Sequence, residues 1–338
     1  MKKYLHFVLL GFALCFTVFF TACSEKQYFT PNKDAIKGDF KIDSKLSDDI
    51  LQANKNGAVL EDGTLITRQG IFNANLKSEY LFLNATSESI IVADYSNNNV
   101  HFLSNEGKIL KSFEFEFMPL SASVRGNILA VILANNTAIL WDISTNEELF
   151  SNKGGSVYAI NSKNASPYFL DSTIILPTLD GKLIVVDLNA YKILRTITLG
   201  SGNYFGNIIY LSVEGENLIV ATNSKVSTII SGKEFSYAVN VNDILSKDGK
   251  IFVLSLEGEV IMLDLLLNEL NKKKFPFATL NSIIVSDAIY TLESQGFLIK
   301  IDLQTFSDEI YKINIAEYKN SFYTDSTIYY DNKIIKVK

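Results

Sequence analysis

Cysteine and histidine are scarce in this 338-residue chain, which contains two of each. Cys15 and His6 lie within the first 22 residues, so the rest of the chain holds only Cys23 and His101. A single thiol cannot form an internal disulfide, and a single histidine cannot build a histidine-based zinc site or an acid–base pair. We therefore expect stability to come from packing alone. We expect no catalytic, metal-binding or cofactor-binding residues, and no enzyme activity.

A serine triad would have to use His101, which lies in the apolar segment 100–103 that indicates a strand. We interpret His101 as structural. Tryptophan occurs once, at Trp141, and we interpret it as a packing residue. Positive charge is also limited: the formal net charge of −6 becomes −8 if Lys2 and Lys3 are removed with a leader. Nucleic-acid binders carry basic patches, so we expect no nucleic-acid partner.

The N-terminus has the features of a secretory leader. Lys2 and Lys3 precede an apolar stretch at residues 5–20, which is short for a transmembrane helix. Phe20-Thr21-Ala22-Cys23 follows directly and resembles the lipobox of bacterial lipoproteins. This resemblance predicts a signal peptide at 1–22 and lipidation of Cys23 with acyl chains such as palmitate, which anchor the chain to a membrane. The alternative is an ordinary secretory leader followed by an incidental cysteine.

Residue 24 is serine rather than aspartate, which by resemblance to the enterobacterial sorting rule favours the outer membrane, facing the periplasm. Residues 23–56 are mostly polar, with few aromatics. We expect them to form a flexible tether. The remaining residues, 57–338, are rich in Ile, Leu, Val, Phe and Tyr and can bury a large core.

A repeat is visible in the second part of the chain. Apolar strand, Gly or Asn turn and apolar strand recur as predicted β-hairpins, and no sustained helical periodicity is present. An aspartate closes four of them, at Asp142, Asp187, Asp264 and Asp302, and Ser104 lies 38 residues before the first. Their recurrence suggests that these aspartates bond turn amides rather than act in catalysis. A period of roughly 38 to 45 residues, all β, predicts propeller blades.

The repeat count predicts an all-β propeller of seven four-stranded blades, with the last blade shared by both termini. In this arrangement, residues 58–67 supply the strand that completes the C-terminal blade, and closure removes exposed sheet edges. Eight blades are the alternative, with 58–67 as a hairpin of its own blade, because Thr67 lies 37 residues before Ser104. We prefer seven because little before Asn56 resembles an innermost strand.

Leader, polar segment and β-ring together resemble the BamB-like lipoproteins, which belong to the propellers related to PQQ-dependent quinoproteins. The resemblance implies a scaffold that binds an envelope protein, the outer-membrane barrel assembly complex being one candidate. The quinoprotein tryptophan signature and vicinal cysteine pair are absent. A small-molecule or glycan-binding propeller and a surface adhesin remain alternatives. We interpret the run Lys272-Lys273-Lys274 as a solvated turn or outer strand, with contact to acidic lipid headgroups as the other possibility.

Overall fold

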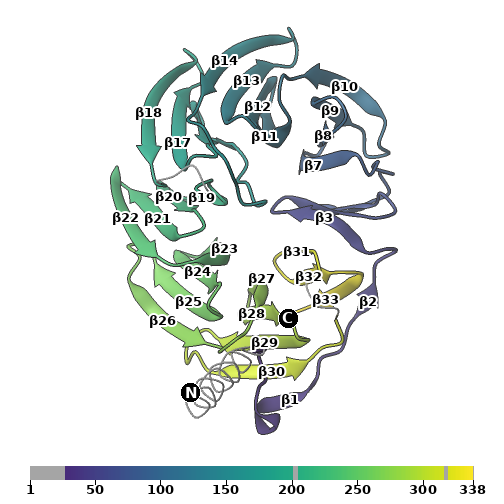
Figure 1. Ribbon diagram of the computed structural model, residues 1–338, viewed down its shortest axis with the longest axis vertical. Coiled ribbons are helices and arrows are strands. Elements are labelled where there is room, and N and C mark those ends of the chain that lie inside the picture. Colours follow the sequence, from purple (N-terminus) through teal and green to yellow (C-terminus); the bar gives the residue numbers. More distant parts are fainter. Residues whose placement is uncertain (1–26, 201–204, 316–318, 338) are drawn as a thin grey trace, which may run out of the picture.

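The computed structural model describes residues 27–200, 205–315 and 319–337, and in these ranges the chain forms a ring of β-sheets (Figure 1). The only helix in the described ranges is the short 3-10 turn η1 (Lys33–Ala35). The predicted signal peptide and Cys23 lie outside the described residues. The all-β propeller predicted from the repeat is confirmed.

The ring has eight blades, and in the first six blades the four strands follow one another antiparallel from the centre outward (Figure 1). Blade 1 contains β3 (Ile50–Asn54), β4 (Gly57–Leu60), β5 (Leu65–Thr67) and β6 (Gly70–Phe72). Blade 2 contains β7 (Tyr80–Ala85), β8 (Ile90–Asp94), β9 (Asn99–Leu103) and β10 (Ile109–Glu114). Blade 3 contains β11 (Pro119–Arg125), β12 (Ile128–Leu133), β13 (Thr137–Asp142) and β14 (Glu147–Lys153).

The next three blades have the same order. Blade 4 contains β15 (Tyr168–Phe169), β16 (Thr173–Pro177), β17 (Lys182–Asp187) and β18 (Lys192–Thr198). Blade 5 contains β19 (Tyr210–Glu214), β20 (Asn217–Ala221), β21 (Lys225–Ile230) and β22 (Lys233–Ala238). Blade 6 contains β23 (Val241–Lys247), β24 (Lys250–Ser255), β25 (Glu259–Asp264) and β26 (Glu269–Lys274).

The last two blades each receive a strand from the N-terminal segment (Figure 1). Blade 7 contains β27 (Leu280–Val285), β28 (Ala288–Glu293), β29 (Phe297–Asp302) and β30 (Asp308–Lys312), and β1 (Ile36–Asp39) pairs parallel to β30 as a fifth strand. Blade 8 contains β31 (Ser321–Tyr323), β32 (Thr327–Tyr330) and β33 (Lys333–Lys336), and β2 (Ser44–Lys45) completes it antiparallel to β33. Both termini therefore share the last blade, as predicted.

The preference for seven blades is wrong, and the eight-blade alternative is correct. Residues 58–67 do not complete the C-terminal blade; they form β4 and β5 of blade 1. Sequence reasoning missed the innermost strand, β3, because the polar residues Gln52 and Asn54 interrupt its apolar run. Gln52 explains that polarity: its Nε2 donates to the Tyr80 carbonyl oxygen at 2.6 Å, and its Oε1 accepts from the Phe82 amide at 2.9 Å.

The flexible tether predicted for residues 23–56 is also wrong for its described part. β1, β2 and β3 all lie in that segment and pair with the ring. Phe29 is buried, and its ring lies 6.0 Å from that of Phe275 and 5.6 Å from that of Phe297. The propeller therefore begins well before residue 57. β2 was not recognisable in the sequence because both of its residues are exposed and polar.

The hydrophobic core lies between neighbouring blades. The second strands are almost entirely buried, as in β8 and β28, whereas the outer strand β18 is mostly exposed. Separate apolar clusters fill the interfaces; one of them joins blades 2 and 3, and another joins blades 1 and 8 through Ile50, Leu60 and Phe322. Sheets buried on both faces explain why the inner strands are continuous apolar runs. At the axis of the ring, polar and apolar side chains of the innermost strands lie together.

The recurring aspartates bond turn amides, as predicted. Each lies at the end of the third strand of its blade, and its Oδ1 accepts from a backbone amide of the following turn. Two of these backbone amides donate at 2.7 Å: that of Ser144 to Asp142 and that of Asn189 to Asp187. The amide of Asn268 donates to Asp264 at 2.8 Å, and the amide of Gln304 donates to Asp302 at 2.9 Å. Their recurrence therefore reflects the turn of the repeat.

Candidate functional site

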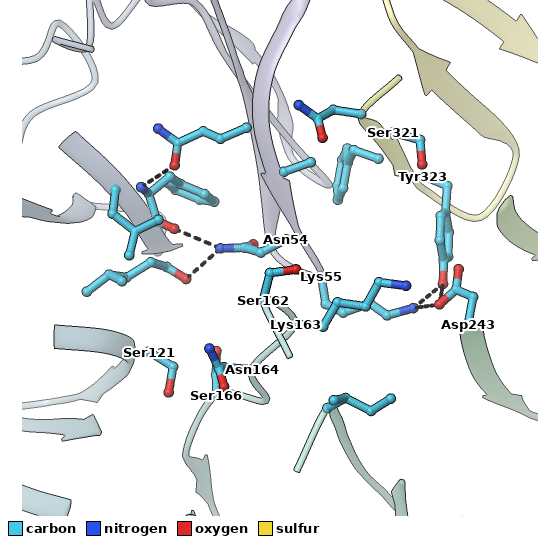
Figure 2. A pocket seen from close by; sticks show the side chains of 18 of the residues that line it. Asn54, Lys55, Ser121, Ser162, Lys163, Asn164, Ser166, Asp243, Ser321 and Tyr323 are labelled. Atoms are coloured by element: carbon cyan, nitrogen blue, oxygen red, sulfur yellow. Dashed lines mark hydrogen bonds and ion pairs between the residues drawn. The ribbon is translucent and has the colours of Figure 1, made fainter. Parts of the chain in front are cut away.

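A cavity of about 560 Å³ occupies the central channel of the ring (Figure 2). Its wall comes from the innermost strands of several blades and from residues 160–166, which belong to the connection between blades 3 and 4. That connection, residues 154–167, is the longest between any two blades. It reaches the opposite side of the ring, because Asn56 Nδ2 donates to Ser166 Oγ at 3.0 Å and Lys163 Nζ donates to the Asn242 carbonyl oxygen.

Polar side chains of the innermost strands link each blade to the next. Asn54 Nδ2 in blade 1 donates to the Phe82 carbonyl oxygen of blade 2 at 2.8 Å, and Asn84 Nδ2 in blade 2 donates to that of Ala122 in blade 3 at 3.1 Å. Asn320, just before β31, donates to the Leu51 carbonyl oxygen at 2.9 Å and so joins blade 8 to blade 1. These bonds satisfy backbone groups that face the channel, where no further strand can pair with them.

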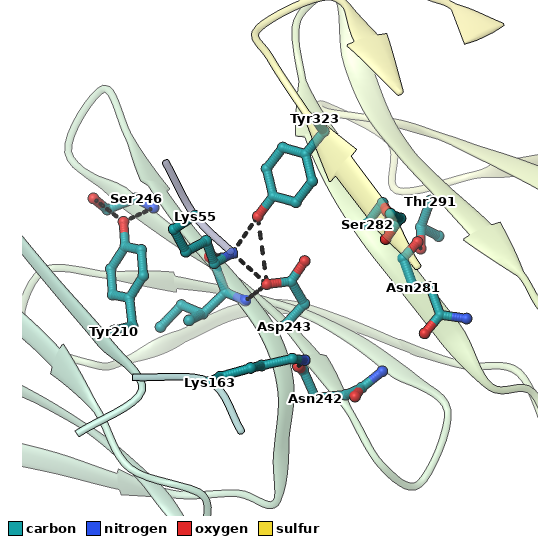
Figure 3. A network of polar contacts seen from close by, with 12 residues as sticks. Lys55, Lys163, Tyr210, Asn242, Asp243, Ser246, Asn281, Ser282, Thr291 and Tyr323 are labelled. Atoms are coloured by element: carbon teal, nitrogen blue, oxygen red, sulfur yellow. Dashed lines mark hydrogen bonds and ion pairs between the residues drawn. The ribbon is translucent and has the colours of Figure 1, made fainter. Parts of the chain in front are cut away.

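An ion-pair network crosses the channel (Figure 3). Lys55, from the turn between β3 and β4, donates to Asp243 Oδ1 in blade 6 and to the Tyr323 hydroxyl in blade 8. Its third donor reaches the Ile244 carbonyl oxygen at 3.1 Å. The ammonium nitrogen also lies 4.7 Å from the centre of the Tyr323 ring and 5.8 Å from that of Tyr210. Lys55 thereby connects three blades.

The charges in this network stabilise one another. Burial alone raises the pKa of Asp243, but the Lys55 and Lys163 ammonium groups outweigh it and hold that pKa below its usual value. Burial alone lowers the pKa of Lys55, and the Asp243 carboxylate with Tyr323 more than offsets this, so the pKa is raised. Burial and the Asp243 charge raise the pKa of Tyr323. At neutral pH the network therefore holds a carboxylate, an ammonium and a neutral phenol.

Lys163 brings a second ammonium group to the same wall. Desolvation in the channel lowers the pKa of Lys163, Asp243 offsets part of this, and Lys55 lowers it further. The cavity wall also contains Arg68 and Lys319. Arg68 lies 3.4 Å from Asp325, and Lys319 lies within 3.5 Å of two carboxylates. Asp243 is the only carboxylate among the described residues of the wall.

The residues singled out from the sequence lie elsewhere. His101 is buried in β9, where its Nδ1 is 2.7 Å from Ser112 Oγ and its ring is 5.5 Å from that of Tyr80. Trp141 packs edge-on against Phe115 at 5.6 Å, which confirms its packing role. Neither lines the cavity.

The lysine run Lys272-Lys273-Lys274 lies on the outer strand β26, as predicted. Lys272 Nζ lies 3.6 Å from Glu259, and Lys273 forms an ion pair with Asp308 of the neighbouring blade. Within the parts of the chain that the structure describes, no cluster of His, Cys, Asp and Glu side chains is arranged to hold a metal ion. In the same ranges, no helix has the length and apolar character needed to cross a membrane.

Sequence reasoning named none of the network residues. Lys55 lies in the segment expected to be a tether, and Asp243 and Tyr323 are 80 residues apart and meet only in the closed ring. One signal was present: Asn242, Asn281 and Asn320 recur at intervals of 39 residues, which marks a polar position at or just before the innermost strands of blades 6, 7 and 8. A polar position that repeats with the period of the blades indicates side chains that face the channel.

Three solved structures resemble the chain in fold over most of its length. BamB from Moraxella catarrhalis matches with a TM-score of 0.65 at 13% identity, covering 92% of this chain and 99% of that one. The computationally designed Ika8 protein matches with a TM-score of 0.63 at 14% identity, over 89% of this chain and 99% of that one. The C-terminal WD40 domain of Sif2 matches with a TM-score of 0.63 at 12% identity, covering 89% of this chain and 99% of that one. The likeness to BamB expected from the sequence is thus confirmed for the fold.

Sequence comparison gives a more specific relation. No protein-family model matches the chain. Plasminogen-binding protein PgbB from Helicobacter pylori strain J99 is 33% identical over 368 aligned residues, covering 92% of this chain and 68% of that protein. PgbB from strain 26695 is likewise 33% identical, and the alignment covers 93% of this chain and 68% of that protein. Identity at this level over nearly the whole chain establishes common descent, and the chain belongs to the family of the plasminogen-binding protein PgbB.

Proposed function

We propose that this protein is a lipid-anchored, non-enzymatic propeller of the cell envelope, and that it binds plasminogen at the cell surface. The observation that carries the proposal is the 33% identity over 92% of the chain with a protein named for plasminogen binding. Among the functions considered from the sequence, this corresponds to the surface adhesin. A closed ring suits such a role, because it presents loops from every blade on two faces while its sheet edges stay protected.

The N-terminal leader supports the anchor. Cleavage before Cys23 leaves a thiol and an amine that can both carry acyl chains, and two or three chains hold a protein firmly on a membrane. β1 begins at Ile36, so only a short stretch separates the lipid from the ring. The proposal therefore places the propeller close to the membrane surface.

The non-enzymatic assignment rests on how the ionisable side chains of the channel are used. Lys55, Asp243 and Tyr323 bond to one another across three blades and so hold the ring together. His101 lies between Ser112 and Asp94 inside blade 2, and none of these three residues lines the cavity. The assignment therefore depends on the channel, where the buried carboxylate and phenol bond to Lys55.

Binding of the full lipidated chain to plasminogen tests the proposal. The chain is reconstituted in lipid nanodiscs and passed over immobilised plasminogen in surface plasmon resonance, with immobilised serum albumin and empty nanodiscs as controls. We expect saturable binding to plasminogen above both controls. Binding no stronger than to albumin would refute the plasminogen assignment. Protease treatment of intact cells then tests display, because an outward-facing propeller is cleaved without cell lysis.

A scaffold role in outer-membrane protein assembly is a second candidate, motivated by the fold shared with BamB at a TM-score of 0.65. It requires the opposite orientation, with the ring in the periplasm. Crosslinking in intact cells followed by purification of the tagged chain distinguishes the two. Repeated recovery of a barrel-assembly protein, with resistance to external protease, would favour the scaffold. Cleavage by external protease without such recovery would favour the plasminogen-binding role.

A further inference from the structure

The central channel carries more positive than negative charge at one place. Lys55 and Lys163 both act on Asp243, and the described wall contains no other carboxylate. One carboxylate balances one ammonium group, so the second charge lacks a partner inside the cavity. An unbalanced charge that its surroundings desolvate attracts a counter-ion more strongly than the same charge in open solvent.

Lys163 is the ammonium group with bonding capacity left over. An ammonium has three donors, and those of Lys55 are taken by Asp243, the Ile244 carbonyl and the Tyr323 hydroxyl. Lys163, in contrast, donates to the Asn242 carbonyl oxygen, and it forms no ion pair with any carboxylate of the described residues. The channel wall desolvates the ammonium group of Lys163, but the residue as a whole is exposed, so its remaining donors are accessible to a ligand that enters the channel.

Neutral hydrogen-bonding groups line the same cavity as this charge (Figure 2). Ser162, Asn164 and Ser166 accompany Lys163 on the connection between blades 3 and 4, and Ser121 and Ser321 come from innermost strands. Ser162 and Lys163 are neighbours in the chain and both are exposed residues of the cavity wall, so a ligand in the channel can reach the hydroxyl and the ammonium group together.

We propose that the central channel binds a small polyhydroxylated anion, a sugar acid or a sugar phosphate. Lys163 bonds the anionic group, and the serine and asparagine side chains of the wall bond the hydroxyls. The cavity volume of about 560 Å³ lies in the range of small-molecule sites. This site is independent of plasminogen binding, because it lies inside the ring rather than on its outer faces.

Isothermal titration calorimetry on the full chain in detergent tests the proposal with three probes: glucuronate, glucose 6-phosphate and neutral glucose. The variant Lys163→Gln removes the charge, and Lys163→Arg retains it. Lys153→Gln, on the outer strand β14, removes an exposed lysine outside the cavity wall and serves as the matched control. Circular dichroism confirms that each variant is folded.

We expect glucuronate or glucose 6-phosphate to bind and glucose to bind about tenfold more weakly or not at all. Preference between the two anions identifies the acid or the phosphate as the natural class. Lys163→Gln should weaken binding about tenfold, Lys163→Arg should restore much of it, and Lys153→Gln should have no effect. Equal affinity for glucose, no binding of either anion, or unchanged affinity in folded Lys163→Gln would each overturn the proposal.

If Lys163→Gln does not fold, Ser162→Ala decides the matter. Ser162 is an exposed residue of the cavity wall, so we expect its substitution to leave the melting temperature unchanged. The affinity for the anion should fall severalfold, because the ligand loses a hydroxyl partner beside Lys163. A folded Ser162→Ala variant with unchanged affinity would overturn the proposal in that case.

Discussion

Replacing Asp243 with asparagine should loosen the closed ring. The side chain of Asp243 is 9% exposed and accepts from Lys55, Tyr323 and the Ile244 amide. Removing its charge leaves the Lys55 ammonium without a counter-charge, and breaking a buried pair in this way costs about 3–5 kcal/mol. The Lys55 side chain keeps 34% exposure, so water offsets part of this loss. We expect the lower end, about 3 kcal/mol, and a melting temperature lower by roughly 5 °C.

Thermal unfolding followed by circular dichroism measures the effect, with Asp171→Asn, at an exposed aspartate, as the control. The double variant Lys55→Met with Asp243→Asn should lose less stability than the two single variants added together, because the second change removes the stranded charge. A melting temperature for Asp243→Asn within about 1 °C of wild type, or strict additivity in the cycle, would refute the reasoning.

The same network predicts how the difference depends on pH. The pKa of Asp243 is lowered on folding, so its stabilisation is complete above the pKa of an unfolded aspartate and is lost as the pH falls through the folded value. The pKa of Lys55 is raised, so its share is complete below its unfolded value of 10.5 and is lost only as the pH rises above that. The stability gap between wild type and Asp243→Asn should therefore stay constant from about pH 5 to pH 9 and narrow in acid.

Three further predictions concern the fold and the anchor. Gly107→Ala should cost about 2–4 kcal/mol in urea unfolding, because its Cβ would lie 1.9 Å from a backbone carbonyl oxygen; Gly126→Ala, also at positive φ but in open space, should cost only about 1 kcal/mol, and equal losses would contradict this. Burial raises the pKa of Asp180, but hydrogen bonds outweigh this and lower the pKa to about 2. The ionised side chain should therefore contribute about 2 kcal/mol to the free energy of unfolding at neutral pH. The stability lost in Asp180→Asn should accordingly shrink as the pH falls from about 5 toward 2, and a pH-independent loss would exclude this cause. Cys23→Ala should move the chain from the membrane to the soluble fraction and abolish labelling by a palmitate analogue, whereas retention at the membrane would show another anchor.

The repeat was readable in the sequence because it depends on local chemistry. Each third strand ends in a turn whose amides need an acceptor, and aspartate supplies it at Asp142, Asp187, Asp264 and Asp302. Inner strands are buried on both faces, so they are continuous apolar runs that stand out against their turns. Blade architecture, the outer position of the lysine run at 272–274 and the packing role of Trp141 all followed from such local patterns.

Closure of the ring was decided by tertiary structure. The strand that completes blade 8 is the exposed pair Ser44–Lys45, and the innermost strand of blade 1 carries Gln52 and Asn54 toward its neighbour. Neither segment has the apolar pattern of a strand, because one lies on the outer edge and the other faces the polar channel. Their strand geometry comes from partners more than 250 residues away or in the next blade.

The channel network shows the same limit for the site. No sequence motif connects the four residues Lys55, Lys163, Asp243 and Tyr323. They come from different blades or from the connection between two blades, so the number of blades between them sets their separation in the sequence. The sequence by itself determined that the chain builds repeated β-blades and carries almost no histidine or thiol chemistry. Only the closed ring decided which polar side chains meet at its axis, because a buried charge takes its partner from whatever blade the closure places opposite.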